Sequence, residues 1–354
     1  MPDNAHTVSR VIAIEEHAWS PGLRAALLKF GADDTVTRFS NAEQTNLQLL
    51  DVGEARLARM DHAGVDFQVL SITAPGTQQF PAAIAVPLAR DANDFLADAV
   101  QRRPDRFAAF ATLPVGAPEA AAKELQRCVT EMKFVGAMLF PRSGADYLDH
   151  SRFRPVFEAA AELNVPLYIH PGMPLPAVRD ACYGGFSPAT NLMLSTGGWG
   201  WHAEAGLAAL RLILAGTFDR HPGLQLILGH MGEMLISFAD RADALTHTSG
   251  LERSVLDCIT GNFYATPGGL FSHRMLRQVV DVLGPERILF AVDDPYNSAL
   301  GSSAKGTGDS DSTCGFARAF IETAPISPED KSKFAHLNAE RLLLARTSSS
   351  TAHA

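Results

Sequence analysis

The sequence predicts an α/β protein folded as a (β/α)8 TIM-like barrel, and three observations support this fold class. Short apolar, β-branched runs alternate eight times with longer amphipathic segments along the 354 residues, as strands and helices do in such a barrel. The runs LQLIL and RILFAV are continuously apolar, which is typical of parallel strands buried on both faces. The competing layout, a doubly wound open sheet, usually carries a glycine-rich phosphate loop after its first strand, and none follows Val11–Ile14.

The elements follow from these patterns in chain order. Eight strands are expected from the apolar runs, at Val11–Ile14, Phe67–Ile72, Phe107–Thr112, Gly136–Phe140, Pro166–Ile169, Leu224–Leu228, Asn262–Tyr264 and Ile288–Val292. Eight helices are expected from the amphipathic segments, at Val52–Ala63, Ile84–Arg102, Pro118–Met132, Phe153–Leu163, Ala203–Asp219, Met234–Ala244, Ser272–Leu283 and Pro328–Leu344. Each strand is therefore followed by a helix.

The chain is predicted to form one domain over residues 1–346, because no linker-like segment divides it. Residues 21–50 form a long excursion after the first strand, and we expect a cap-like segment over the barrel mouth there. Residues 297–315 are rich in Gly and Ser and are expected to be a flexible loop. Residues 347–354 are expected to be a disordered tail.

The composition excludes several classes of partner. A formal net charge of −9, without any run of Lys or Arg, argues against binding to nucleic acid. No apolar stretch is long enough to span a bilayer, and MPDNAHTVSR lacks the apolar run of a secretory leader. Four scattered cysteines suit reduced thiols better than a disulfide framework or a thiolate metal site; they are Cys128, Cys182, Cys258 and Cys314. We therefore expect a cytoplasmic protein without a membrane partner.

Ionisable side chains gather where four of the expected strands end. The first strand runs into Glu15, Glu16 and His17. The fifth, sixth and eighth are followed by His170, by His230 with Glu233, and by Asp293 with Asp294. The chemistry of a (β/α)8 barrel lies at the carboxyl ends of its strands. Burying charge costs several kcal/mol unless it is paired or bound to a metal, so these groups are expected to share one site.

The spacing refines this site to a metal centre. Side chains alternate along a strand, so Glu15 and His17 point to one side and Glu16 to the other. With His170 and Asp293 they make two carboxylates and two imidazoles, a mixed set that suits one divalent ion, Zn²⁺ or Mn²⁺. A lone histidine at a strand end is more often a hydrogen-bonded structural residue. Surface roles are the expectation for the others: His62, His150, His202, His221, His247, His273 and His336.

These motifs resemble a known family. The stretches IAIEEHAW, LYIHPG, FDRHPGLQLILGHMGE, NFYAT and ILFAVDDPY are similar, in that order, to landmarks of the amidohydrolase-2 branch of the amidohydrolase superfamily. The closest resemblance is to aminocarboxymuconate-semialdehyde-decarboxylase-like enzymes, especially metal-dependent benzoate decarboxylases of the γ-resorcylate and 2,3-dihydroxybenzoate type. RMDHAGVDFQVLSITAPGTQ and ISPEDKSKFAHLNAERLL also look like this group, so the likeness runs from about Val11 to Leu344.

The resemblance implies roles for individual residues. The ligand positions fall on Glu15, on His17 (a ligand in some members), on His170 and on Asp293. His230 and Glu233 match a His-x-x-Glu pair that assists proton transfer. Arg241 matches an arginine that reaches the substrate of a neighbouring subunit, in enzymes that are homodimers or homotetramers. Two departures stand out, because Glu15 replaces the first histidine of the usual His-x-His and Asp294 replaces an aromatic residue of the substrate-pocket wall.

The implied reaction is a non-oxidative decarboxylation, possible in both directions, of an ortho-hydroxybenzoate-type acid. The metal would chelate the carboxylate and phenolate oxygens, and Asp293 would protonate the ring carbon that loses CO₂. Burial beside Asp294 and Glu233 is expected to raise the pKa of Asp293 for this task. His230 with Glu233 would relay the proton, and Arg241 would anchor a substrate oxygen.

Two alternatives stay open at this point. A metal-dependent amidohydrolase-type hydrolase of an ester, lactone or amide would use a metal-bound water, with Asp293 as general base. A catalytically inactive barrel used for binding is the other, although it would have no use for four buried charges. Four aromatic residues are candidates for a substrate pocket or for the core; they are Trp19, Phe80, Trp199 and Trp201.

Overall fold

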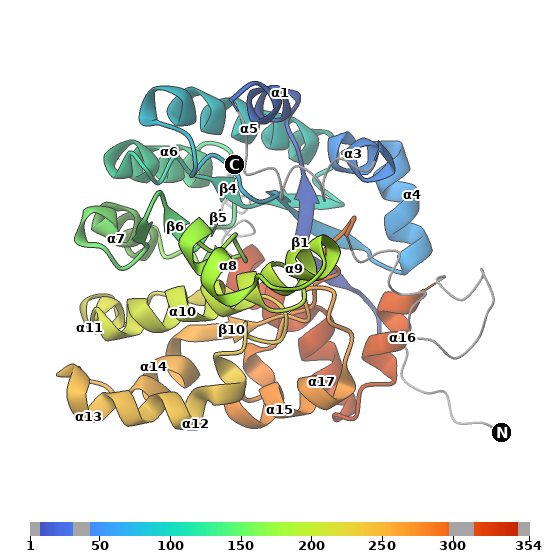
Figure 1. Ribbon diagram of the computed structural model, residues 1–354. Helices are drawn as coiled ribbons and strands as arrows, with labels where there is room; N and C mark the ends of the chain where they lie inside the picture. Colours follow the sequence, from blue (N-terminus) through green and yellow to red (C-terminus); the bar gives the residue numbers. More distant parts are fainter. Residues whose placement is uncertain (1–7, 31–42, 297–314, 346–354) are drawn as a thin grey trace.

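Parallel strands form the wall of a barrel in the computed structural model, which describes residues 8–30, 43–296 and 315–345 (Figure 1). The strands of the wall are β1 (Ile12–Ala18), β2 (Phe67–Ile72), β3 (Phe107–Ala109), β4 (Ala111–Thr112), β5 (Ala137–Leu139), β8 (Leu167–Ile169), β9 (Leu226–Leu228) and β10 (Phe263–Ala265). They pair in two runs, ordered β1–β2–β3 and β10–β9–β8–β5–β4. Every pairing between them is parallel.

The third expected strand joins the two runs. Phe110 separates β3 from β4, and its amide donates to the carbonyl of Leu70 in β2 at 2.9 Å. The next amide, that of Ala111, donates to the carbonyl of Gly136 at the same distance. One continuous segment therefore bridges both runs.

The eighth expected strand closes the barrel on the other side. Ile288 bridges to Ala265 at the end of β10, and Phe290 bridges to Ala13 in β1. The amide of Leu289 donates to the carbonyl of Ala265 at 2.9 Å, and that of Ile14 donates to Phe290 at 3.1 Å. The (β/α)8 barrel is thereby complete, and the predicted fold class is confirmed.

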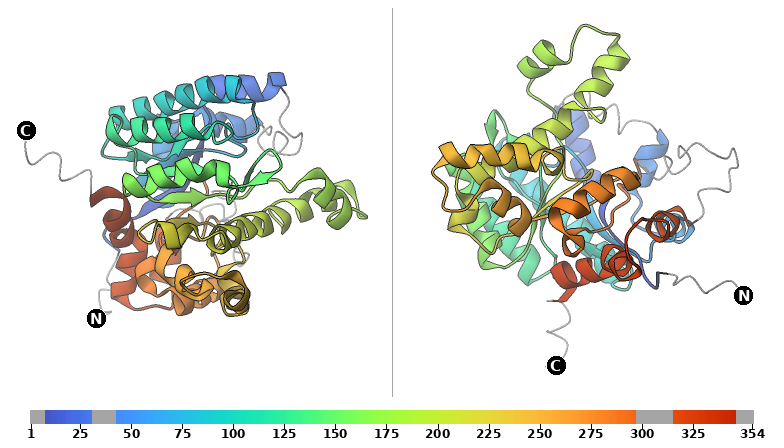
Figure 2. Two further views of the ribbon diagram at one scale, coloured as in Figure 1. Left: turned by 90° about the vertical axis from the view of Figure 1, so that its left-hand side faces the viewer. Right: turned by 90° about the horizontal axis from the view of Figure 1, so that it is seen from below.

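Helices surround this wall, as the views of Figure 2 show. Between the strands lie α1 (Pro21–Phe30), α3 (Glu43–Leu50), α4 (Glu54–Ala63), α5 (Ala82–Arg102), α6 (Pro118–Thr130), α7 (Arg154–Glu162), α8 (Pro176–Cys182), α9 (Pro188–Ser195), α10 (Gly200–Leu214), α11 (Thr217–Arg220), α12 (Ala239–Ala242), α13 (Thr246–Ser249) and α14 (Val255–Asn262). After β10 follow α15 (His273–Leu283), α16 (Phe316–Glu322) and α17 (Pro328–Ser332), which continues in the π-helical turns Lys333–Leu337 and Glu340–Leu344.

The outer layer differs from the expectation in three places. The helix expected at Met234–Ala244 is broken into short turns around α12, and α14, which the sequence analysis did not predict, precedes β10 instead. The short hairpin of β6 (Arg142–Ser143) and β7 (Asp146–Tyr147) also lies outside the wall. The pair α8–α9 projects from the body of the molecule (Figure 2). Each of these segments is eight residues long or shorter, which gives a periodic pattern too few turns to stand out.

The excursion expected at residues 21–50 contains α1 and α3. Helix α1 packs beside α5, and α3 packs against β1, where the amide of Trp19 donates to the carbonyl of Leu49 at 2.9 Å. A cap over the barrel mouth stays a prediction. The expected loop at 297–315, apart from Gly315, and the expected tail at 347–354 lie outside the described residues. In the described part of the chain, no helix combines the length and apolarity needed to cross a membrane.

The hydrophobic core has two layers, one inside the barrel and one between the barrel and the helices. The side chains of β1 do not alternate strictly between these two layers. Ile12 and Ile14 belong to the cluster that fills the barrel, whereas Ala13 packs in the layer toward the helices. The pairing of β1 with β2 is irregular between Ala13 and Glu16, as in a β-bulge. Two consecutive residues, Ile14 and Glu15, consequently face the interior, and the charged residues of β1 are fully buried within the strand rather than beyond its end.

Candidate metal centre and active site

Four predicted ligand candidates converge at the carboxyl ends of the barrel strands. Glu15 and His17 extend from β1, His170 follows β8, and Asp293 follows the eighth strand. One ligand-type atom from each lies within 4.8 Å of those of the other three, and all four residues are buried. The fold therefore assembles two carboxylates and two imidazoles from three separate strands.

The outer atoms of these residues are held by neighbouring groups. His170 Nδ1 donates to the carbonyl of Pro171 at 2.9 Å, and His17 Nδ1 lies 3.1 Å from Ser71 Oγ. Glu15 Oε2 accepts a hydrogen bond from the hydroxyl of Tyr168. Such partners fix the orientation of a metal ligand and leave its other atom available. The sequence does not mark Tyr168 as a site residue, because a tyrosine in an apolar strand has the pattern of a core residue.

The inner atoms are left facing one another. Glu15 Oε1 and His17 Nε2 are buried without a hydrogen bond. His170 Nε2 lies 3.4 Å from Glu15 Oε1, and His17 Nε2 lies 3.1 Å from Asp293 Oδ1. Buried polar atoms are ordinarily paired, so this convergence fits a divalent cation bound among them.

The pKa shifts of the ligand candidates also favour a bound cation. Burial raises the pKa of Glu15 to about 8, against the opposing charge of His230. Burial also lowers the pKa of His170 to about 3, which keeps it in the neutral form that binds metals. A buried carboxylate and a neutral imidazole are both stabilised by a nearby cation, and a mixed N/O set suits Zn²⁺ or Mn²⁺.

Gly268 leaves room for this arrangement. A Cβ at this position would lie 2.5 Å from Glu15 Oε2 and 2.7 Å from the amide nitrogen of His230. Its φ of +48° is also one that other residues rarely adopt. Any side chain at Gly268 would therefore displace either the glutamate or the turn that carries His230.

That turn, residues 230–234 after β9, has left-handed backbone throughout. The φ angles are 46° for His230, 59° for Met231, 88° for Gly232, 51° for Glu233 and 66° for Met234. A left-handed conformation costs roughly 1–2 kcal/mol for each residue with a Cβ, and it is normally adopted by single residues. Strain of this kind persists where the surroundings over-determine it, typically at functional sites.

The left-handed turn brings His230 against Glu233 and toward the metal centre. His230 Nδ1 lies 2.7 Å from Glu233 Oε1, and its Nε2 lies 3.7 Å from Asp293 Oδ2. Burial alone would lower the pKa of His230, but the surrounding carboxylates, led by Glu233, raise it well above its ordinary value. Burial would raise the pKa of Glu233, and the two histidines beside it, His230 and His202, lower it to about 2. The pair is thus an imidazolium and a carboxylate.

The expectation that burial raises the pKa of Asp293 is wrong for this arrangement. Burial does act in that direction, but contacts with His17 and His230 outweigh it and lower the pKa to about 2. The physical reason is that Asp293 has two imidazoles beside it, and the expected repulsion from Asp294 does not dominate.

Asp294 does not form part of the pocket wall, contrary to expectation. Its buried carboxylate lies 3.6 Å from Arg56 and 3.4 Å from Arg59, both on α4. Arg56 also donates to the carbonyl of His17. The ion pair therefore ties α4 to the strand that carries the ligands, and Asp294 serves the framework behind the site.

His202 belongs to the site, although the sequence predicts a surface role for it. It lies in the first turn of α10, and its Nδ1 is 2.8 Å from Glu233 Oε2. Its ring lies 4.5 Å from that of His230, centroid to centroid. The sequence offers only a weak signal for it, because His202 and Gly206 share a helix face on which a small residue permits close packing.

A cavity of about 530 Å³ opens beside the metal centre. One end presents polar groups, among them His170, His230 and Asp293. The remainder is mainly apolar or aromatic, lined by Met193, Trp199, Trp201, Met234, Leu270 and Met275. The described residues that line it include neither Lys nor Arg. Of the four aromatic candidates, Trp199 and Trp201 line the cavity, whereas Trp19 and Phe80 belong to the core.

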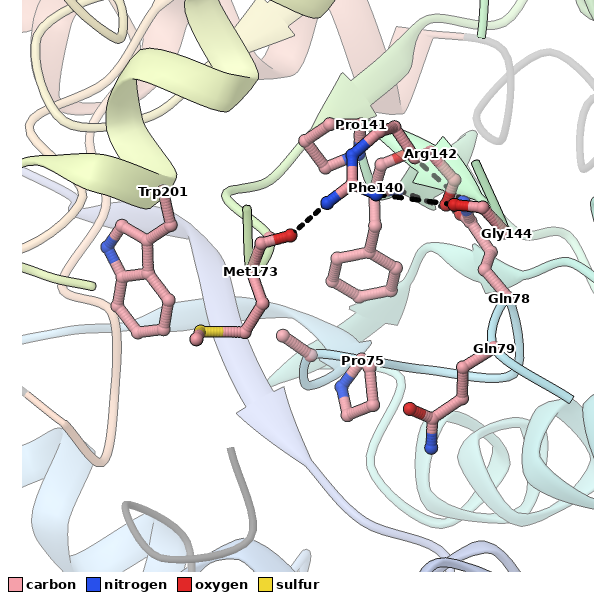
Figure 3. Close-up of a pocket in the computed structure, with 11 residues that line it drawn as sticks. Pro75, Gln78, Gln79, Phe140, Pro141, Arg142, Gly144, Met173 and Trp201 are labelled. Atoms are coloured by element: carbon pink, nitrogen blue, oxygen red, sulfur yellow. Dashed lines mark hydrogen bonds between the residues drawn. The ribbon is translucent and has the colours of Figure 1, made fainter. Parts of the chain in front are cut away.

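A second cavity of about 210 Å³ lies next to the first and shares Ala74 and Trp201 with it. Figure 3 shows the indole of Trp201 on one side and Arg142 on the other, with the guanidinium donating to the carbonyl of Met173. Arg142 is also paired with Glu204 at 3.0 Å. The positive charge of Arg142 is therefore compensated by Glu204 within the protein. The predicted substrate anchor, Arg241 on α12, is exposed and does not line either cavity of this chain.

Comparison with known proteins agrees with this geometry. The sequence pattern of the amidohydrolase family matches residues 18–344. A γ-resorcylate decarboxylase from Rhodococcus jostii is 35% identical over 317 residues, which cover 85% of this chain and 90% of the relative.

Two solved structures are also similar. The crystal structure of 5-carboxyvanillate decarboxylase from Sphingomonas paucimobilis superimposes with a TM-score of 0.83 at 33% identity, covering 95% of this chain and 99% of that one. A dihydroxybenzoic acid decarboxylase from a Polaromonas species, with bound manganese and the inhibitor 2-nitroresorcinol, has a TM-score of 0.79 at 32% identity, with 95% and 97% covered. Both the sequence and the fold place this chain in the amidohydrolase-2 family.

Proposed function

We propose that this protein is a metal-dependent, non-oxidative decarboxylase of an ortho-hydroxybenzoate-type acid. The observation that carries the proposal is the buried set Glu15, His17, His170 and Asp293, whose inner atoms converge beside His230 at the polar end of a cavity. The relatives described as decarboxylases support it, because they cover nearly the whole chain at about a third identity. A glutamate at the first ligand position also favours decarboxylation over hydrolysis.

One divalent metal ion belongs to this function. The four residues would hold Mn²⁺ or Zn²⁺, and Mn²⁺ is favoured because it is bound in a similar structure. When bound, such an ion supplies Lewis-acid stabilisation to the carboxylate and phenolate oxygens of a substrate.

The residues of the chain supply and place the proton. Decarboxylation exchanges CO₂ for one proton at the same ring carbon, so each turnover consumes one proton. His230 holds that proton at Nε2, 3.7 Å from Asp293 Oδ2, while Glu233 compensates its charge. The proton passes from His230 to Asp293, which delivers it to the ring carbon, and loss of CO₂ then restores aromaticity. The relay is refilled from solvent after product release.

The lining of the cavity favours a substrate with a single carboxylate. Apolar and aromatic side chains cover the walls away from the metal centre, and no Lys or Arg stands among the described lining residues. A second carboxylate placed there would be desolvated without a partner, which costs several kcal/mol.

A panel of ortho-hydroxybenzoates tests the function. With Mn²⁺- or Zn²⁺-loaded protein, we expect CO₂ release from members with one carboxylate, and at least tenfold lower kcat/KM for members with a second ring carboxylate. Release of CO₂ would be followed together with cleavage of aryl esters and lactones. Ester or lactone cleavage without any CO₂ release would refute the decarboxylase and favour the hydrolase. Inactivity toward both classes would favour a binding role.

Arg241 is proposed to act across a subunit boundary, in a homodimer or homotetramer located in the cytoplasm. It is exposed and lies outside the cavities of its own chain, as an arginine that serves a neighbouring site would. Mixing inactive Arg241→Ala and Asp293→Asn subunits should then restore about a quarter of wild-type activity by random pairing in a dimer. No recovery after verified subunit exchange, or a monomer by sedimentation, would contradict the proposal.

A further inference from the structure

We propose that His202 is a positioning residue: it holds the second oxygen of Glu233 and thereby fixes the left-handed turn that presents His230 to the reacting centre. The inference rests on the proposed function, because His230 is placed there as the proton carrier. His202 itself does not contact the reacting atoms in this scheme, and it acts through Glu233.

Glu233 is bound at both of its carboxylate oxygens. Its carboxylate is fully buried and carries one imidazole on each oxygen, with His230 Nδ1 at 2.7 Å from Oε1 and His202 Nδ1 at 2.8 Å from Oε2. The three groups are close enough to hold a metal ion. Unlike the ligand set around Glu15, however, each of their nitrogen and oxygen atoms at the contact is satisfied by a hydrogen bond, so the set is a His–Glu–His bridge.

The hydrogen bond between His202 and Glu233 has a definite direction. A carboxylate oxygen accepts, so His202 Nδ1 carries a proton and donates to Glu233 Oε2 at 2.8 Å. On the far side of the ring, His202 Nε2 lies 3.1 Å from the indole Nε1 of Trp201 and 3.2 Å from the carbonyl oxygen of Gly197. These two contacts hold the ring with Nδ1 facing Glu233.

The turn that His202 contacts is strained. Glu233 and Met234 sit at φ angles of 51° and 66°, which both residues avoid when unconstrained. Helix α10 touches this turn twice. A Cβ at Gly206 would overlap the carbonyl oxygen of Glu233, so the helix backbone lies directly against the turn. One helical turn earlier, His202 binds the side chain of Glu233.

The consequence concerns His230. If Oε2 of Glu233 loses its partner, the buried carboxylate must rotate or draw in water to satisfy it, and its Oε1 then leaves the position that orients His230. A misplacement of about 1 Å in a catalytic group can lower a rate by about 10²-fold. His202 also lines the cavity, but the proposed role is exerted through Glu233 on the rate of the chemical step.

Two variants separate this role from simple packing. His202→Ala removes the donor, whereas His202→Asn returns an N–H at nearly the position of Nδ1. We expect His202→Ala to lower kcat by roughly 10–100-fold with little change in KM or metal content, and His202→Asn to recover most of that loss. His247→Ala, at an exposed histidine on α13, is the matched control. Equal losses in the Ala and Asn variants would overturn the inference.

A double-mutant cycle tests whether His202 acts through His230. In a His230→Ala background, His202→Ala should have little further effect, because the group that it positions is gone. Independent, multiplicative losses would contradict the positioning role.

A spectroscopic readout separates failure of this inference from failure of the proposed function. In ¹⁵N-histidine-labelled protein, the ring nitrogens of His230 should shift in His202→Ala and return toward wild type in His202→Asn. Wild-type protein that releases no CO₂ would refute the proposed function, yet these shifts would still decide whether His202 positions His230. Unchanged His230 resonances in His202→Ala would refute the inference even in an active enzyme.

Discussion

Replacing Asp293 with Asn is expected to lower kcat for CO₂ release by roughly 10³-fold or more, since general acid catalysis alone contributes about 10²–10⁴. The amide keeps the shape of the side chain but cannot pass a proton from His230 to the ring. It also removes one negative charge from the metal centre. The measurement is the single-turnover rate of CO₂ release with metal content determined on the same sample, so that loss of the proton donor is distinguished from loss of the ion.

Asp294→Asn is the matched control for this prediction. Its carboxylate adjoins Asp293 in sequence but pairs with Arg56 and Arg59 behind the site. We expect kcat per folded molecule to stay within a few-fold of wild type, although the free energy of unfolding falls because a buried arginine loses its partner. A fully active Asp293→Asn variant with normal metal content would remove Asp293 from the chemistry.

Removing the metal is the second change with a large expected effect. Chelation should abolish CO₂ release, and Mn²⁺ should restore it. The free energy of unfolding should fall on chelation and recover on reloading, because a ligand present at 1,000 times its dissociation constant raises it by about 4 kcal/mol. Thermal unfolding of the metal-free and reloaded protein, beside the activity of each, checks both statements.

The choice of ion provides the control here. Ca²⁺ prefers six to eight oxygen ligands, whereas this site offers two imidazoles, so Ca²⁺ should neither restore activity nor raise the melting temperature comparably. Full activity in protein verified to be metal-free would exclude a metal-dependent reaction. Restoration of activity in Glu15→Gln as readily as in wild type would exclude Glu15 from the ligand set.

The sequence predicted the barrel because its signals are local. Apolar runs such as Phe67–Ile72 and Leu226–Leu228 are strands in the structure, and their carboxyl ends necessarily share one rim. The convergence of Glu15, His17, His170 and Asp293 follows from that rule. The bulge in β1 does not, because strict alternation from Ile12 and Ile14 would turn Glu16, rather than Glu15, into the barrel.

Other features of the site depend on contacts between distant segments. His202 became part of the site only because α10 packs against the left-handed turn, and nothing in the sequence around it specifies that turn. The pKa of Asp293 could not be inferred either, because its direction depends on how closely two imidazoles approach the carboxylate. The ion pairs of Asp294 could not be predicted either, since its arginine partners lie more than 200 residues earlier in the chain.

The wide separation of the ligands along the chain has a consequence for how the protein acquires its metal. Glu15 and His17 leave the ribosome long before Asp293, which lies on the segment that closes the barrel against β1 and β10. The full ligand set cannot exist before that last strand is in place. Metal content therefore reports completion of the barrel, and a nascent or truncated chain that ends before the eighth strand is protected from capturing the ion prematurely at this centre.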